Sequence, residues 1–302
     1  MNEERMTSKL SRDYRERKHK LQSVRWMLFF VIAIQTAVTL LSNLISSFFP
    51  QSPPVYLQML FIELFAYILP ISIYARNNRI LTARDIREGF GLKEFPLKLL
   101  PLVVIAGIFC QLVMVVINLP VNLLTNVSDG YIPSSFLELI FAIFVLGIIP
   151  AIFEEFLLRG VVHGVMAELN TAAAAIFTSV LFALMHGSFA GFFGYLFMGF
   201  CLVFVLRRTG SLYACIIFHL ANNVMALLLS YFSDALFWSP IETIKLFSVG
   251  LIIFGAVMGA ITYMTDTPKK VRLIKTTEFL GQNFINLPVI LCIVGVIWIM
   301  CM

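Results

Sequence analysis

The chain is a series of long apolar runs separated by short polar connections. Most runs approach or exceed the roughly 20 residues that an α-helix needs to cross the hydrocarbon core of a bilayer. The pattern predicts eight or nine membrane-spanning helices, the marginal ones being the short fifth run and the C-terminal run. The runs are Trp26–Phe49, Val55–Ala75, Leu97–Leu119, Phe136–Val165, Ala172–Gly187, Phe189–Leu206, Leu212–Phe232, Leu246–Met264 and Ile285–Met302.

The composition agrees with this pattern, since 60% of the 302 residues are hydrophobic and only 13% are charged. A soluble globular domain does not need so much apolar surface, so the sequence predicts an all-α polytopic membrane bundle. We expect a basic N-terminal arm at residues 1–25 and one transmembrane domain at residues 26–302. The five cysteines all lie in apolar runs without a CxxC pair, which indicates packing rather than disulfides or structural zinc.

Lysine and arginine gather in alternate connections. Met1–Arg25 holds eight of them, Arg76–Lys98 holds six, and six more lie at 207–208 and 269–275. Three connections hold none: Pro50–Pro54, Pro120–Ser135 and Ser233–Glu242. The positive-inside rule therefore predicts a cytoplasmic N-terminus. Topology also explains the net charge of +5, so we expect anionic membrane lipids, and no nucleic acid, as partners of the basic arm.

One connection has its own pattern. The segment Arg79–Glu94 mixes apolar and charged residues and contains Gly89 and Gly91. This pattern fits an interfacial amphipathic helix and a solvated loop equally well.

Two adjacent acids and an arginine interrupt the fourth apolar run. An ionisable side chain at the centre of a spanning helix costs about 2.5–3.5 kcal/mol on insertion scales, and such residues usually mark functional sites. Glu155 and Arg159 are four residues apart, so they share a helix face and are predicted to form an ion pair. Glu154 lies about 100° from Glu155 around the helix axis. It therefore remains available to face a cavity.

Two histidines of later runs are candidates to meet Glu154. Glu154 lies 16 residues before Asn170, in the polar turn after the fourth run, and His186 lies 16 residues after it. In an antiparallel hairpin both would lie at one level, about 24 Å from the turn at 1.5 Å per residue. His219 follows Arg208 by only about ten residues. It is expected to be shallower unless the hairpin projects into the cytoplasm or the spans tilt.

A carboxylate, two imidazoles and an amide are suitable groups for hydrolysis. Glu154 can deprotonate a water as general base. His219 and Asn223, four residues apart on one helix face, can stabilise the oxyanion that forms when the water attacks a carbonyl. A GxSxG nucleophile pattern and an HExxH zinc-protease pattern are both absent from the sequence.

Three motifs follow one another on successive runs. They are EExxxR at Glu154–Arg159, FxxxH at Phe182–His186 and HxxxN at His219–Asn223. In this order they resemble the CPBP family, which comprises the CAAX proteases, including the eukaryotic Ras-converting endopeptidase, and the bacteriocin-processing, or Abi, proteins. The resemblance covers about residues 140–230, within a catalytic core expected at about 136–232.

The resemblance implies a role for each motif residue. Glu154 would activate the attacking water, and His186 would help to hold or polarise it. The other four form two pairs: the oxyanion site of His219 with Asn223, and the structural ion pair of Glu155 with Arg159.

The metal dependence of the CPBP family is disputed. Glu154, His186 and His219 could ligate zinc with one coordination position left open, or they could act without a metal. The wide spacing of these residues along the chain favours the metal-free reading slightly. No cofactor is therefore expected with certainty, and zinc is the candidate.

The function expected first is an intramembrane endopeptidase that cuts near the cytoplasmic membrane face. Prenylated CAAX ends are the eukaryotic substrate of the family. A short chain without an organellar signal is typical of a bacterial cell membrane protein, which favours hydrophobic or lipidated peptides, including bacteriocin leaders. The alternative is a non-catalytic binding protein for bacteriocin immunity or sensor-kinase regulation. A proton- or ion-coupled transporter is a third reading, but the repeats and broken helices typical of transporters are not detectable.

Overall fold

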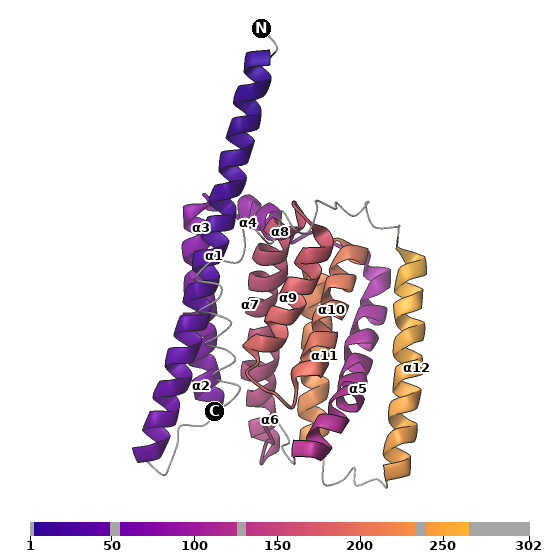
Figure 1. Cartoon of the computed structure of the whole chain (residues 1–302). Helices are drawn as coiled ribbons and strands as arrows, with labels where there is room; N and C mark the ends of the chain where they lie inside the picture. Colours follow the sequence, from indigo (N-terminus) through magenta and orange to yellow (C-terminus); the bar gives the residue numbers. More distant parts are fainter. Residues whose placement is uncertain (1–2, 49–54, 126–130, 233–239, 266–302) are drawn as a thin grey trace.

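The computed structural model describes residues 3–48, 55–125, 131–232 and 240–265, and within these ranges it contains helices and no strand. The long helices stand side by side along a common direction, with α1 at one edge and α12 at the other (Figure 1). The elements are α1 (Glu3–Phe48), α2 (Val55–Phe61), η1 (Ile62–Ile68), α3 (Leu69–Asn77), α4 (Ala83–Gly89), η2 (Leu97–Leu99), α5 (Leu100–Thr125), α6 (Phe136–Ala142), η3 (Ile143–Ile148), α7 (Ile149–Glu155), η4 (Phe156–His163), α8 (Gly164–Ala167), α9 (Thr171–Met185), α10 (Phe192–Thr209), α11 (Leu212–Tyr231) and α12 (Pro240–Met264).

Seven stretches of the described chain are long and apolar enough to cross a membrane. Two of them are composite, since α2, η1 and α3 form one stretch and α6 to α8 form another. The predicted helical membrane bundle is thereby confirmed. The fifth predicted run forms α9, which at 15 residues is shorter than a full span, and the predicted run Ile285–Met302 lies outside the described residues. Helix α1 begins at Glu3, so the basic arm from residue 3 onward continues the first span as one helix.

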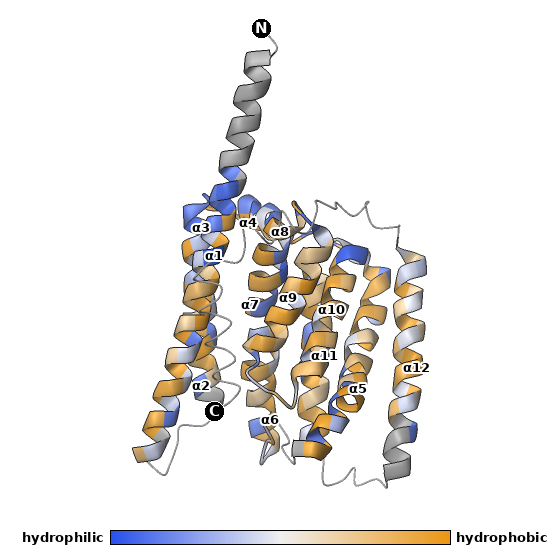
Figure 2. Cartoon of the chain, in the orientation of Figure 1, coloured by the Kyte–Doolittle hydropathy of each residue, from blue (hydrophilic) through white to orange (hydrophobic). Residues whose placement is uncertain are grey.

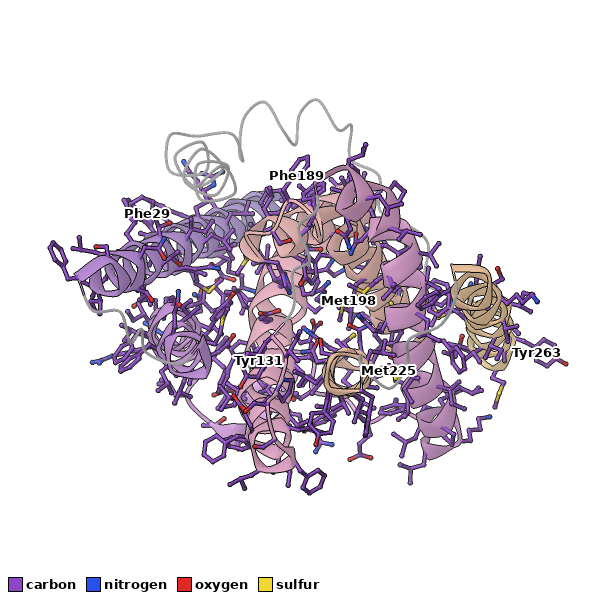
Figure 3. All side chains as sticks on the ribbon, turned by 90° about the horizontal axis from the view of Figure 1, so that it is seen from below. Phe29, Tyr131, Phe189, Met198, Met225 and Tyr263 are labelled. Carbon is purple, nitrogen blue, oxygen red and sulfur yellow. The ribbon has the colours of Figure 1, made fainter. Side chains whose placement is uncertain are left out.

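The surface of the bundle is apolar over most of its length. Figure 2 shows hydrophilic residues gathered at the end that carries α3, α4 and α8, and hydrophobic colours along the middle of the helices. Figure 3 looks along the bundle and shows Met198 inside it and Tyr263 on its outer edge. Their exposed fractions are 1% and 91%. Apolar side chains thus face outward as well as inward, as a lipid environment requires.

The segment after the second span contains both predicted structures. Residues Ala83–Gly89 form α4, which begins with a capping box: the side chain of Thr82 accepts a hydrogen bond from the backbone of Asp85, and the Asp85 carboxylate accepts one from the backbone of Thr82. The hydrogen bonds that Thr82 and the backbone of Leu81 donate to the Asp85 carboxylate lower its pKa. The chain then turns at Gly91, whose φ of +70° favours glycine. The Gly91 carbonyl accepts a hydrogen bond from Leu212 at the start of α11 (3.0 Å).

Three π-helical segments lie in the composite spans. Segment η1 contains Glu63. Segments η3 and η4 flank α7, which ends with Glu154 and Glu155. π-Helical turns are rare and often lie at functional sites. Their positions therefore direct attention to the region where η1 packs against α7.

Helices α5 and α11 are in close contact at Gly107. A Cβ atom at this position would lie 2.3 Å from the carbonyl oxygen of Phe218 and 2.8 Å from the Cβ of Ala221. Both helices must therefore move apart to accommodate any side chain there. Because Phe218 is adjacent to His219, this contact also fixes the position of that imidazole.

We expect Gly107→Ala to destabilise the protein by about 1–3 kcal/mol, the usual effect of overpacking. Gly259→Ala is the matched control, because a Cβ at that position of α12 meets no heavy atom within 4 Å. Thermal unfolding of the two variants in detergent measures the difference. Equal unfolding temperatures would contradict the close contact of α5 with α11.

Candidate active site

Glu154 lies at the end of α7 and faces a cavity of about 370 Å³. The carboxyl side chain is largely buried, with 9% of the residue exposed. The cavity is bordered by η1, α5, α7, α10 and α11, and Tyr131, which lines it, is labelled in Figure 3. Four of the six predicted site residues line this cavity: Glu154, His186, His219 and Asn223. The structure therefore brings together the residues of all three motifs.

The other two predicted site residues, Glu155 and Arg159, lie behind His219. Arg159 Nη1 donates to Glu155 Oε1 at 3.0 Å, and both side chains have no exposed surface. His219 Nδ1 is 2.9 Å from the same carboxylate oxygen. Because a carboxylate accepts hydrogen bonds, Nδ1 is the donor here, and Nε2 is the ring atom nearer Glu154, 4.0 Å from Glu154 Oε2. The predicted ion pair thus exists, and it also orients His219.

Arg159 connects the site to two further helices. Its Nη2 donates to the backbone carbonyl of Gly199 on α10 at 3.2 Å. Its guanidinium lies 4.7 Å from the ring centroid of Phe182 on α9, a cation–π distance. Gly199 itself permits close approach, because a Cβ there would lie 2.8 Å from the backbone of Ser179 on α9. One buried guanidinium therefore contacts α7, α9 and α10.

His186 is positioned by its own helix and by Tyr195. It follows the last residue of α9, and its Nδ1 is 2.7 Å from the carbonyl oxygen of Phe182. Since a carbonyl can only accept, Nδ1 carries the hydrogen and Nε2 remains for other contacts. The imidazole stacks on the ring of Tyr195 with centroids 3.8 Å apart. The chain turns at once through Gly187, which has a φ of +63°.

Asn223 is held by two backbone carbonyl groups of η3, just before Pro150. Pro150 has no N–H, so the turn where η3 meets α7 has one helical donor fewer. Asn223 Nδ2 lies 3.4 Å from the carbonyl oxygens of both Leu146 and Gly147. These are long hydrogen bonds, and the amide nitrogen has two hydrogens. The asparagine thus ties α11 to η3 while lining the cavity.

His219 lies at the level of Glu154 rather than at a shallower one. Glu154 is 16 residues from Asn170, whereas His219 is only about ten residues from Arg208. The two counts differ because the turn between α8 and α9 extends further out of the bundle than the end of α10 (Figure 1). The chain from Glu154 to its turn therefore reaches further than the chain from His219 back to the end of α10, although α10 and α11 are longer helices than α7 and α9. The equal numbers of residues from Asn170 predicted that Glu154 and His186 lie at one level, and both side chains line the same cavity.

The candidate zinc set does not form a metal site in this structure. Within the described ranges, three or more His, Cys, Asp or Glu side chains never converge as metal ligands would. The Nδ1 atoms of His186 and His219 are occupied by Phe182 and Glu155. We therefore derive no chemical step through a metal.

Sequence analysis missed one acidic residue of the cavity, Glu63. It lies in η1, has an exposed fraction of 4%, and lines the same cavity as Glu154. The sequence does indicate Glu63, because it is the only charged residue between Val55 and Ala75 and charges within spans are usually functional.

Tyr195 was also missed, since an aromatic residue in a Phe-rich helix has no distinctive pattern.

Comparison with known families adds one result. Residues 136–225 match the model of the family described as type II CAAX prenyl endopeptidase, Rce1-like. This segment is similar to the Rce1-like family. The resemblance predicted from the three motifs is confirmed, and the match spans all of them. Comparisons with curated proteins and with solved structures give no match.

The match supports conclusions that hold for the Rce1-like family in general. Its members are proteases, so the match supports a peptide hydrolase that acts on peptide substrates. The seven apolar stretches support an integral membrane protein. Residues 3–125, which include Glu63, lie outside the matched segment.

Proposed function

We propose that the protein is an intramembrane endopeptidase in which Glu154 activates the water that attacks the peptide bond. The observation that carries this proposal is the pairing of Glu154 with His219 at one cavity, 4.0 Å apart, with Glu155 and Arg159 fixing the imidazole from behind. A water on the cavity side can contact both Glu154 and His219 Nε2. General base catalysis requires this reach between the base and the water.

The reaction then proceeds in two steps. Glu154 takes a proton from the water, whose oxygen bonds to the carbonyl carbon, and the carbonyl oxygen becomes an oxyanion. His219 acts here as an imidazolium: its Nδ1–H stays on Glu155, and its Nε2–H donates to that oxyanion together with the Asn223 amide. When the oxyanion collapses, the carbon–nitrogen bond breaks and Glu154 returns its proton to the leaving amine. His186 Nε2 orients the water during the attack.

The proposed substrates are hydrophobic or lipidated peptides cut near the cytoplasmic face of a bacterial cell membrane, with bacteriocin leaders among the candidates. The hydrophilic end of the bundle in Figure 2 carries the connection Arg76–Lys98, which includes α4, and the basic residues Arg207 and Arg208 lie in the last turn of α10. The positive-inside rule assigns this end, with the N-terminus, to the cytoplasm. The cavity wall combines apolar side chains with amides, which suits a peptide segment.

The oxyanion role predicts a loss of rate on removal of the imidazole. We expect His219→Ala to lower kcat for peptide cleavage by about 10²–10³-fold, as removal of an oxyanion donor does. Asn223→Ala should lower kcat less, because the two Nδ2 hydrogens of Asn223 are shared between the oxyanion and two backbone carbonyls. His19→Ala, which removes an exposed histidine of α1, is the control. Unchanged kcat in His219→Ala would exclude this role.

A further inference from the structure

A second cavity of about 250 Å³ meets the first one at Glu154. It lies between α1, the α2–η1 stretch and the end of α9. The two cavities share four lining residues: Met59, Glu63, Glu154 and His186. A peptide whose scissile bond lies beside Glu154 can therefore extend one way into the first cavity and the other way into the second.

The wall of the second cavity is unusually polar for two apolar helices. Gln35, Thr36 and Thr39 come from α1, and Gln58 comes from α2. Polar side chains within spans usually face a bundle interior or a wet cavity and are retained for function. Gln35 also connects α1 to the site, since its Nε2 donates to the carbonyl of Met185 at 2.6 Å, directly before His186.

Three acceptor atoms in this wall have no hydrogen-bond partner within the described chain. They are Oε1 of Gln35, Oε2 of Glu63 and Oε2 of Glu154, and all three are buried. A buried acceptor without a donor costs about 1–3 kcal/mol, and more when it is charged. The wall thus offers hydrogen-bond acceptors and the carboxyl groups of Glu63 and Glu154, and, like that of the first cavity, it includes no lysine or arginine among the described residues.

We propose that the second cavity binds the amino side of the cleaved bond, with Glu63 pairing with the ammonium group that cleavage creates. The ligand class is the N-terminal ammonium of a released peptide, and Gln35 Oε1 accepts from a backbone N–H of the same segment. A carboxylate and an ammonium form a strong, charge-assisted hydrogen bond. The carboxylate product then occupies the first cavity, whose wall contains several amide side chains. This inference rests on the proposed protease function.

The test uses product inhibition of the purified full-length protein. Two synthetic peptides are compared as inhibitors: the amine-bearing product of the best substrate, and the same peptide with its amino group replaced by hydrogen. For the wild type we expect the amine-bearing peptide to inhibit at least about tenfold more strongly. Glu63→Gln, which preserves the side-chain shape, should reduce this ratio to about one, and Glu63→Asp should retain most of it.

Glu88→Gln is the matched control, because Glu88 is exposed on α4 and pairs with Arg84; its ratio should equal that of the wild type. Thermal unfolding shows that each variant is folded. Cleavage by the wild type with a ratio near one, or an unchanged ratio in Glu63→Gln, would overturn the amine site while leaving the protease function intact. Failure of the wild type to cleave any peptide would overturn both.

Discussion

Glu154→Gln is expected to lower kcat/KM for peptide cleavage by about 10²–10⁴-fold, the usual contribution of a general base. The amide has nearly the shape of the carboxyl group but cannot take a proton from water. Glu154 has no ion-pair partner closer than 4.0 Å among the described residues, so the substitution breaks no strong contact. Steady-state cleavage of a membrane-embedded peptide measures the effect.

Two controls make this result specific. Glu94→Gln changes an exposed acid that pairs with Arg87, and it should cleave like the wild type. The thermal unfolding of Glu154→Gln should remain close to that of the wild type. A fully active Glu154→Gln variant would show that another residue activates the water.

Arg159→Met is expected to destabilise the protein by about 3–5 kcal/mol, the usual effect of removing one partner of a buried ion pair. The substitution leaves the Glu155 carboxylate without its cation in a place with no exposed surface. It also removes the hydrogen bond to the Gly199 carbonyl and the contact with Phe182. Thermal unfolding in detergent measures the change.

The double variant Glu155→Gln/Arg159→Met should recover part of this stability, because no unpaired charge remains. Arg84→Met is the matched control: Arg84 and Glu88 are also four residues apart, but both side chains are mostly exposed. An exposed pair of this kind contributes little to stability, because water and salt screen the two charges. If Arg159→Met and Arg84→Met had equal effects, the buried pair would not be the support of the site that we infer.

Local patterns predicted much of this site. Spacing of four residues predicted the pairing of Glu155 with Arg159, because helix geometry alone sets which side chains are neighbours. Equal counts from the Asn170 turn predicted that Glu154 and His186 lie at the same level, and both line one cavity. Hydropathy predicted seven of the spans, because the length of an apolar run directly reflects bilayer thickness.

Contacts between distant segments were not predictable in the same way. The choice of His219 as a partner of Glu155 depends on how α11 packs beside α7, and one sequence holds no information on that register. The pairing of Asn223 with the carbonyls near Pro150 joins residues more than 70 positions apart. Glu63 could have been noted as the only charged residue of its span, but its place beside Glu154 depends on the contact of η1 with α7, which the sequence does not show.

The most direct test of the central claim is a cleavage assay with purified protein in lipid vesicles. Wild type and Glu154→Gln are incubated with a library of hydrophobic and lipidated peptides, and the products are identified by mass spectrometry. We predict that the wild type cuts a subset of peptides at defined bonds and that Glu154→Gln forms none of these products. No cleavage by the wild type, or the same products from both proteins, would contradict the account, and absence of cleavage would favour a non-catalytic binding protein.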